Sequence, residues 1–269
     1  MQKSNSKYSS ELILIFVTLL WGATFVFVKE ALTDISSMAF IAIRFLIAGL
    51  VLLPFMMKKT FDPKAIKAGV LLGFVLFMGF ATQTIGLKFT TATNSGFLTG
   101  TAVIMIPLLQ ILIEKRAPSK GVIVGSIIVL AGISFLSSGG SSIVNLFSDM
   151  SSNFNFGDGL TLISAFFFAL YMIFLDMKTT KFDFGVLLFL QIITTAVLSI
   201  IGLFIFSLAE LEQIRINVNS NLITAILYTS IFATLITTAL QTKYQKNVTP
   251  AKAGIIFSLE PIFAGVTFF

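Results

Sequence analysis

One acidic residue interrupts the apolar stretch at the end of the chain. Glu260 stands directly before Pro261 in "AGIIFSLEPIFAGVTFF" and lies ten residues after Pro250. In a helix this places it roughly 15 Å along, near the middle of a bilayer. A charge there costs about 2.5–3.5 kcal/mol, so it should face the protein interior or water. Pro261 donates no backbone hydrogen bond and frees a carbonyl near Phe257, so this carboxyl is predicted to bind a proton, a cation or a substrate amine.

A structural role is the alternative for Glu260, in which its neutral form caps a neighbouring helix or pairs with a buried base. Arg44 is the other intramembrane charge, roughly eight residues into the second apolar run. Its guanidinium keeps its proton in proteins. It can extend toward the outer face, or pair with a carboxylate or a helix C-terminus. We expect a structural or gating role for Arg44.

Aromatic and amide side chains form a second set of candidates for lining a substrate cavity. Trp21 offers a flat wall and one N–H donor, and Phe168 occupies the matching place in the second half, with Tyr171 one turn later. Intramembrane amides usually face inward, although many only join helices. The further cavity candidates are Gln83, Asn94, Tyr228 and Gln241.

Two prolines and two glycines suggest bending points. Pro107 and Pro261 each interrupt an apolar run, and Gly100 and Gly254 precede them by the same interval. Proline kinks helices, and small residues permit close helix contact. We expect gating or structural roles here, with ordinary helix packing as the alternative. Asp158 follows "NFG" at the start of another run, and it is predicted to cap that helix.

Composition determines the class of protein that must position these residues. The chain is 56% hydrophobic and 11% charged, with a mean hydropathy of +0.98, whereas soluble domains carry about 25% charged residues. This identifies an integral membrane protein. Cysteine and histidine are absent, which excludes disulfides, thiolate nucleophiles and histidine metal sites. No "GxxxxGK[ST]" phosphate loop occurs. We expect no enzyme activity, no catalytic residue, no cofactor and no bound metal.

Nine apolar runs are long enough to be considered as membrane helices. Lysine and arginine gather in alternate connections, which predicts a cytosolic N-terminus. We expect the protein in the bacterial cytoplasmic membrane. This placement also explains the net charge of +6 without a nucleic-acid partner. The runs cover residues 11–28, 36–57, 67–87, 93–113, 121–138, 158–176, 184–206, 220–241 and 250–269.

The two halves of the chain resemble each other. A shift of 147 residues places 21–52 over 168–199 and Arg44 over Gln191, and a shift of 154 places 93–109 over 247–263. Five helices per copy would invert the second copy in the membrane, an architecture typical of secondary transporters. We therefore expect three parts. They are a first five-helix repeat at 1–138, an extracytoplasmic linker at 139–157, and an inverted repeat at 158–269 with four helices and the tenth missing.

Several segments are similar to the EamA-like permeases of the drug/metabolite transporter superfamily. They are "LLWGATFVFVKEAL", "AFIAIRFLIAGLVLLP", "GLKFTTATNSGFLTGTAVIMIPLL", "NFGDGLTLISAFFFALYMIFL" and "QKNVTPAKAGIIFSLEPIFAG". The resemblance implies an all-α fold of ten helices in two inverted five-helix repeats, nine of them in this chain, and a central cavity lined by helices one, three, four, six, eight and nine. It also implies a homodimer through helices five and ten.

The predicted function is secondary transport by alternating access. The resemblance implies export or exchange of metabolites, amino acids or amphipathic compounds, so the expected partners are a small-molecule substrate and the lipid bilayer. Proton coupling through Glu260 and uncoupled exchange are the two mechanisms to distinguish. A lipid-acting membrane enzyme or a polytopic sensor is the alternative from a different class.

Overall fold

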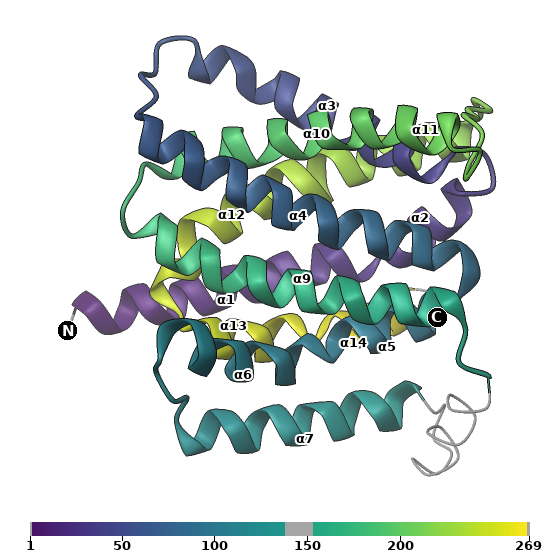
Figure 1. The fold of residues 1–269 in the computed structure, drawn as a ribbon. Helices are drawn as coiled ribbons and strands as arrows, with labels where there is room; N and C mark the ends of the chain where they lie inside the picture. Colours follow the sequence, from purple (N-terminus) through teal and green to yellow (C-terminus); the bar gives the residue numbers. More distant parts are fainter. Residues whose placement is uncertain (1, 138–152, 268–269) are drawn as a thin grey trace.

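Long helices lie side by side, mostly antiparallel, in one bundle (Figure 1). A bilayer supplies no partners for backbone N–H and C=O groups, so apolar runs of this length fold as helices. The computed structural model describes residues 2–137 and 153–267. In these ranges the strand-type pairing is a single isolated bridge between Ile35 and Ile216. The elements are α1 (Gln2–Gly22), α2 (Thr24–Ala31), α3 (Ser37–Met56), α4 (Pro63–Phe89), α5 (Ala92–Gly100), α6 (Ala102–Glu114), α7 (Lys120–Ser137), α9 (Phe156–Thr179), α10 (Phe184–Leu208), α11 (Ser220–Leu227), η1 (Tyr228–Ile236), α12 (Thr237–Tyr244), η2 (Gln245–Asn247), α13 (Pro250–Phe257) and α14 (Glu260–Thr267).

Seven helical stretches in the described residues are long and apolar enough to cross a membrane. The fifth predicted run forms a shorter apolar helix, Lys120–Phe135, and the ninth is divided between α13 and α14. The predicted all-helical, polytopic membrane fold is confirmed. The seven stretches are Tyr8–Ala31, Ser37–Met56, Pro63–Phe89, Ala92–Glu114, Phe156–Thr179, Phe184–Leu208 and Ser220–Asn247.

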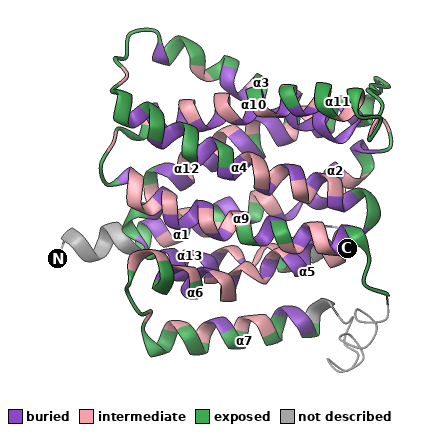
Figure 2. Cartoon of the chain, in the orientation of Figure 1, coloured by how far each residue is buried: buried purple, intermediate pink, exposed green. Residues whose placement is uncertain are grey.

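The main core joins helices from both halves of the sequence. Phe45 of α3, Leu72 of α4, Leu175 of α9 and Ile192 of α10 are fully buried in one apolar cluster. By contrast, α7 at the lower edge of Figure 2 is mostly exposed or half-buried, as expected for a helix that borders lipid. The centre of the bundle is therefore built by α3, α4, α9 and α10.

Two glycines one turn apart bring α4 and α10 into close contact. A Cβ at Gly73 would lie 2.7 Å from the carbonyl oxygen of Gln191, and one at Gly69 would lie 2.9 Å from Cδ1 of Leu190. The hydroxyl of Thr195 donates to the carbonyl of Gly73 at 3.0 Å. Small residues four apart allow this backbone approach in membranes, so α4 and α10 form a tightly joined pair.

Asp158 caps the start of α9, as predicted. Its backbone N–H donates to the side chain of Asn155, and its carboxylate accepts the backbone N–H of Asn155, which completes a capping box. The hydroxyl of Thr90 donates to the same carboxylate at 2.5 Å. This buried carboxylate therefore holds the end of α4 against the start of α9.

Three membrane segments are broken near their middles, and each break carries the same hydrogen bond. At each break a hydroxyl donates to the carbonyl three residues earlier, and Ser/Thr groups that bond back in this way bend helices. The breaks lie at Ala23 between α1 and α2, at Thr101 between α5 and α6, and at Ser258–Leu259 between α13 and α14. The bonds run from Thr24 to Trp21 (2.7 Å), from Thr101 to Leu98 (2.5 Å) and from Ser258 to Ile255 (2.8 Å).

The two prolines predicted to kink their helices lie at different distances from these breaks. Pro107 lies inside α6, six residues after the break at Thr101. Pro261 is the second residue of α14, where a missing N–H costs little because first-turn donors have no helical partner. The first-half bend therefore follows from Thr101, whereas the second-half break adjoins its proline.

Candidate functional site

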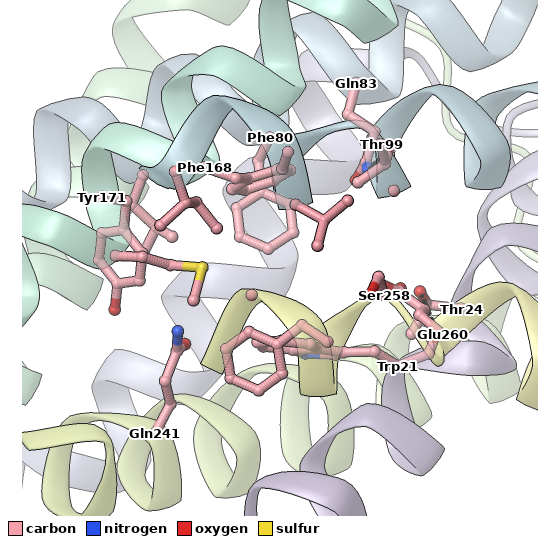
Figure 3. A pocket seen from close by; sticks show the side chains of 18 of the residues that line it. Trp21, Thr24, Phe80, Gln83, Thr99, Phe168, Tyr171, Gln241, Ser258 and Glu260 are labelled. Atoms are coloured by element: carbon pink, nitrogen blue, oxygen red, sulfur yellow. Dashed lines mark hydrogen bonds between the residues drawn. The ribbon is translucent and has the colours of Figure 1, made fainter. Parts of the chain in front are cut away.

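A central cavity of about 100 Å³ lies among these helices, which is enough for several water molecules. Figure 3 shows aromatic side chains along it, with Tyr171 and Gln241 at one end and Glu260, Thr24 and Ser258 at the other. Ten of the residues singled out by the sequence line this cavity, and Asn94, Tyr228, Pro107 and Asp158 lie outside the lining. The ten are Trp21, Arg44, Gln83, Gly100, Phe168, Tyr171, Gln241, Gly254, Glu260 and Pro261.

All three broken segments meet at the cavity. Trp21 and Thr24 flank the first break, Gly100 and Ala102 flank the second, and Glu260 follows the third; all five line the cavity. Interrupted helices in membranes are tolerated where they are buried in protein or line a water-filled space. They are also where transporters bind substrates and ions, because helix ends point dipoles and unpaired backbone groups at the site.

Glu260 begins α14 and is half-buried. Its side chain lies beside Thr24 and Ser258 in Figure 3 and lines the cavity. Both hydroxyl protons are donated to backbone carbonyls, so these oxygens offer only lone pairs to the cavity. This end of the cavity is therefore rich in acceptors and suits a proton, a cation or an ammonium group.

Arg44 is fully inside the protein, with 4% of its surface exposed. Its Nε donates to Oγ1 of Thr234 at 2.5 Å and its Nη2 to the carbonyl of Ala233 at 3.0 Å. The guanidinium lies 4.6 Å from the ring centroid of Phe80, within cation–π range. Arg44 therefore does not extend toward the surface. It places a positive charge on the wall of the cavity that Glu260 also lines.

Trp21 shares its docking point with Arg44. Its Nε1 donates to the carbonyl of Ala233 and to Oγ1 of Thr237, both at 3.1 Å. The indole meets the ring of Phe257 edge to face, with 5.1 Å between centroids. Since its N–H is already used, the indole offers the cavity an apolar face and no donor.

Ala233 lies in η1, a nine-residue π-helix. π-Helical turns are rare and are frequent at functional sites. The stretch "YTSIFATLI" contains neither glycine nor proline, so the sequence analysis did not identify it. Tyr228 begins η1, donates its hydroxyl to the carbonyl of Leu20 at 2.8 Å, and stacks on Phe232. It therefore ties η1 to α1 outside the cavity lining.

Amides surround the opposite end of the cavity. Tyr171 donates its hydroxyl to Gln191 at 2.8 Å, and Gln191 donates to Thr242 at 2.9 Å. Gln241 donates to Gln245, and Gln245 donates to the carbonyl of Met172, both at 2.8 Å. This buried network joins α9, α10 and α12, and such networks fix helix positions when every member is paired.

The remaining predicted residues and several missed ones have local roles. Gln83 donates to Thr99 at 3.0 Å and joins α4 to α5. Asn94 is half-buried in the first turn of α5, where its backbone N–H donates to Thr91. The sequence signal for the missed residues was a hydroxyl close to a mid-run glycine, as in "WGAT" and "LTGT". Missed lining residues include Thr24, Phe80, Thr99, Thr238 and Ser258.

Comparison with known proteins gives this site a context. The sequence profile of the EamA-like transporter family matches residues 9–138 and 155–268. An Archaeoglobus fulgidus protein named "Uncharacterized transporter" is 34% identical over 255 residues, covering 95% of this chain and 75% of its own. A second protein of that organism and name is 24% identical over 269 residues, covering 97% and 88%.

A solved structure supports the same fold. Entitled "Crystal structure of protein", it superposes with a TM-score of 0.74 at 16% identity and covers 97% of this chain and 88% of its own. Likeness at this identity shows a shared fold. Together with the profile match and the membrane-spanning helices, it establishes that the chain is an integral membrane protein of the EamA-like transporter family, within the drug/metabolite transporter superfamily.

Proposed function

We propose that the protein is a secondary transporter that moves small metabolites, amino acids or amphipathic compounds across the cytoplasmic membrane by alternating access, in export or exchange. The supporting observation is that three interrupted segments meet at one cavity whose wall carries both Arg44 and Glu260. Such interruptions bind substrates and ions in other transporters. The proposed orientation has a cytosolic N-terminus, from the distribution of lysine and arginine.

The lining suggests which solutes fit. Trp21, Phe80 and Phe168 present aromatic faces, which favour an apolar or aromatic portion of a substrate. Glu260 and its neighbouring acceptors favour a donor group, and Arg44 favours an acceptor or anionic group. A small molecule with both a polar and an apolar part matches this lining. We assign no chemical step to the chain, because the Thr24 and Ser258 hydroxyls beside Glu260 both donate to backbone carbonyls and not to its carboxyl group.

We further propose that Glu260 carries the coupling proton. Its carboxylate lies near the middle of its segment, and no hydrogen bond or ion pair holds it among the residues that the structure describes. A carboxylate that faces a cavity can take up a proton from one side of the membrane. It can release that proton to the other side after the cavity reopens there.

Uptake into proteoliposomes tests this proposal directly. Amino acids and organic cations are supplied with and without an imposed pH gradient. We expect gradient-driven accumulation by the native protein, and Glu260→Gln should lose the dependence on the gradient, because the amide carries no titratable proton. Asp62→Asn, at an exposed site outside the cavity where the amide oxygen can still accept the Lys64 N–H, is the matched control. Gradient-driven transport by Glu260→Gln at the native rate would exclude coupling through this residue.

A further inference from the structure

Lys29 bridges two walls of the bundle at one end. Its ammonium donates to the carbonyls of Leu87 (2.6 Å), Thr90 (2.8 Å) and Lys88 (3.3 Å). These carbonyls lie at the C-terminal end of α4, where no further helical N–H is available and the helix dipole favours a cation. Lys29 is therefore a charged tie from α2 to α4.

This tie lies directly beyond the cavity. Thr24 and Gln83 line the cavity, and they precede Lys29 and Leu87 by five and four residues in their respective segments. At about 1.5 Å per residue, the tie lies roughly 6–8 Å past the lining. Phe25 and Leu87, both at most 3% exposed, lie in these stretches and belong to one apolar cluster. Buried apolar side chains therefore lie between the lining residues and the tie.

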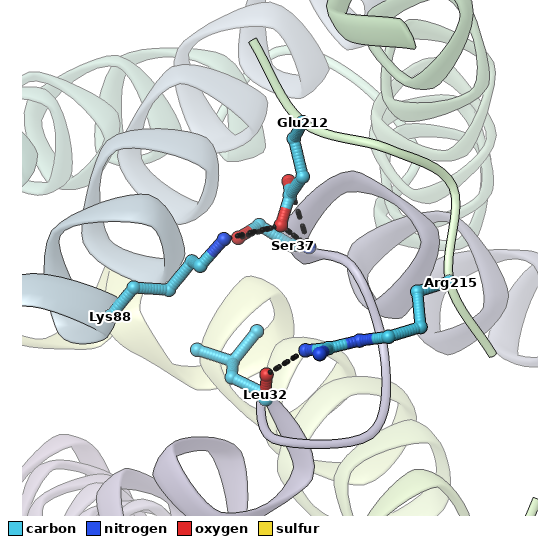
Figure 4. Close-up of polar contacts among 5 residues, drawn as sticks. All are labelled: Leu32, Ser37, Lys88, Glu212 and Arg215. Carbon is cyan, nitrogen blue, oxygen red and sulfur yellow. Dashed lines mark hydrogen bonds and ion pairs between the residues drawn. The ribbon is translucent and has the colours of Figure 1, made fainter. Parts of the chain in front are cut away.

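Glu212 supplies a second layer of contacts outside Lys29. Its carboxylate pairs with the ammonium of Lys88 at 2.6 Å and accepts the backbone N–H of Ser37 at 3.0 Å and the hydroxyl of Ser37 at 3.3 Å (Figure 4). Glu212 is 13% exposed. A carboxylate at the N-terminus of α3 is favoured by the helix dipole. One side chain therefore joins the start of α3 to the end of α4.

The connection that carries Glu212, residues 209–219, holds the same end through further contacts. We call it the strap. Arg215 donates to the carbonyl of Leu32 at 3.0 Å (Figure 4). Backbone bonds join the carbonyl of Arg215 to the N–H of Ser36 at 2.9 Å, and the N–H of Asn217 to the carbonyl of Asp34 at 2.8 Å. The strap thus covers the α2–α3 turn.

We propose that Lys29 and Glu212 are gating residues that hold this end of the bundle closed over the cavity. This inference rests on the proposed transport function, because alternating access requires each end to open in turn. Opening here must separate α2 from α4, which breaks the Lys29 contacts, and must release the end of α4 from the strap. The two layers meet at Lys88, whose carbonyl contacts Lys29 and whose ammonium pairs with Glu212.

Accessibility of the cavity tests the gate without a substrate. The chain contains no cysteine, so Ala102→Cys places a single thiol on the cavity lining. A membrane-impermeant maleimide is applied to intact cells and to inverted vesicles. The extent of thiol labelling in each is normalised to the extent of labelling of the same protein after denaturation. Asn217→Cys in a separate protein identifies the side that the strap faces.

We expect Lys29→Met, combined with Ala102→Cys, to raise the labelling rate of the cavity thiol at least roughly tenfold from the strap side, because the change removes all three charge-assisted contacts of the ammonium. Glu212→Gln should raise it less, because the amide still reaches Ser37. Lys29→Arg keeps the charge but replaces the compact ammonium by a planar fork, so it should restore closure only in part. Lys58→Met, an exposed site at the other end, should leave the labelling rate unchanged. Equal labelling with and without Lys29→Met from the strap side would overturn the proposal.

A reversible cross-link gives a second measurement if Lys29→Met does not fold. Lys88→Cys/Glu212→Cys, joined by a short cleavable thiol reagent, should lose transport and recover it on reduction. A cross-link within one helix, Ser220→Cys/Thr224→Cys, is the control. Undiminished transport in the protein cross-linked between positions 88 and 212 would contradict the gate. Faster labelling of the cavity thiol in an open-gate variant that transports no solute would support the gate and count against the proposed function instead.

Discussion

The segments α5–α6 and α13–α14 occupy equivalent places in the two halves but use them differently. The shift of 154 residues pairs Gly100 with Gly254 and Ile106 with Glu260. In the structure each of these glycines faces the other half: a Cβ at Gly254 would lie 2.6 Å from Cδ1 of Ile106, and one at Gly100 would lie 4.0 Å from Cγ of Pro261. Ile106 is 1% exposed and fills the space left by a glycine. Ile106 and Glu260 both line the cavity, but only Glu260 places a carboxyl group there.

This difference shows how an internal repeat can supply a frame while function depends on departures from it. The breaks differ too, since the one at Thr101 lies six residues before its proline and the one at Ser258 lies three before Pro261. In the second half the break and the charge coincide. The second half, which contains Glu260, is therefore the one expected to respond to ligands.

Placing a charge at Ile106, the position equivalent to Glu260 in the first half, should have the largest effect. Ile106→Glu puts a carboxylate against Gly254 in a closely packed contact, and a charge at such a depth costs about 2.5–3.5 kcal/mol. We expect a large loss of monodisperse protein and a lower melting temperature, measured after detergent extraction. Ile106→Leu is the control and should behave like the native protein. A stable Ile106→Glu would show that the two positions are interchangeable.

Arg44 and its repeat partner Gln191 provide the next comparison. Arg44→Gln makes the two halves alike, removes the charge from the cavity and weakens the contacts with Thr234 and Ala233. Hydrogen bonds to charged groups are worth about 1.5–3 kcal/mol, so we expect a clear fall in thermal stability and roughly tenfold slower transport. Arg44→Lys should recover only part of both, because an ammonium lacks the planar fork. Transport by Arg44→Gln at the native rate would show that Arg44 has no role in transport.

The smallest effect is expected at Asn94. Its side chain lies outside the cavity lining, and its backbone already supplies the bond to Thr91. Asn94→Ala should change the free energy of unfolding by no more than about 0.5 kcal/mol and leave transport rates unaltered. Gln83→Ala, which removes a bond between α4 and α5, should change both by more. Equal losses of stability and transport rate in the two variants would indicate that Asn94 contributes to the site as much as Gln83 does.

Hydropathy was sufficient to predict where the helices lie, because a bilayer constrains segment length and polarity so strongly. The same constraint marked Glu260 and Arg44, whose charges stand out in apolar runs, and both line the cavity. Polar residues without charge were less informative. Gln241 lines the cavity and Asn94 does not, although both are amides in apolar surroundings, since the helix face turned inward depends on neighbouring helices.

The breaks and the π-helix could not be predicted from local sequence. Thr101 bends its segment through a bond to Leu98, yet a hydroxyl elsewhere makes the same bond inside a continuous helix, as Ser164 does with Thr161 in α9. The π-register of η1 places the Ala233 carbonyl where Trp21 and Arg44 both reach it. These donors come from segments about 190 residues or more away, so the arrangement depends on the assembled fold.

The glycine contact between α4 and α10 has a mechanical consequence. Interlocked backbones resist sliding and separation, so α4 of the first half and α10 of the second are expected to travel together. Any group of helices that moves as a rigid body during the transport cycle and includes α4 or α10 then contains segments from both halves of the chain. The two halves that resemble each other in sequence are thus not expected to be the two units that move relative to each other.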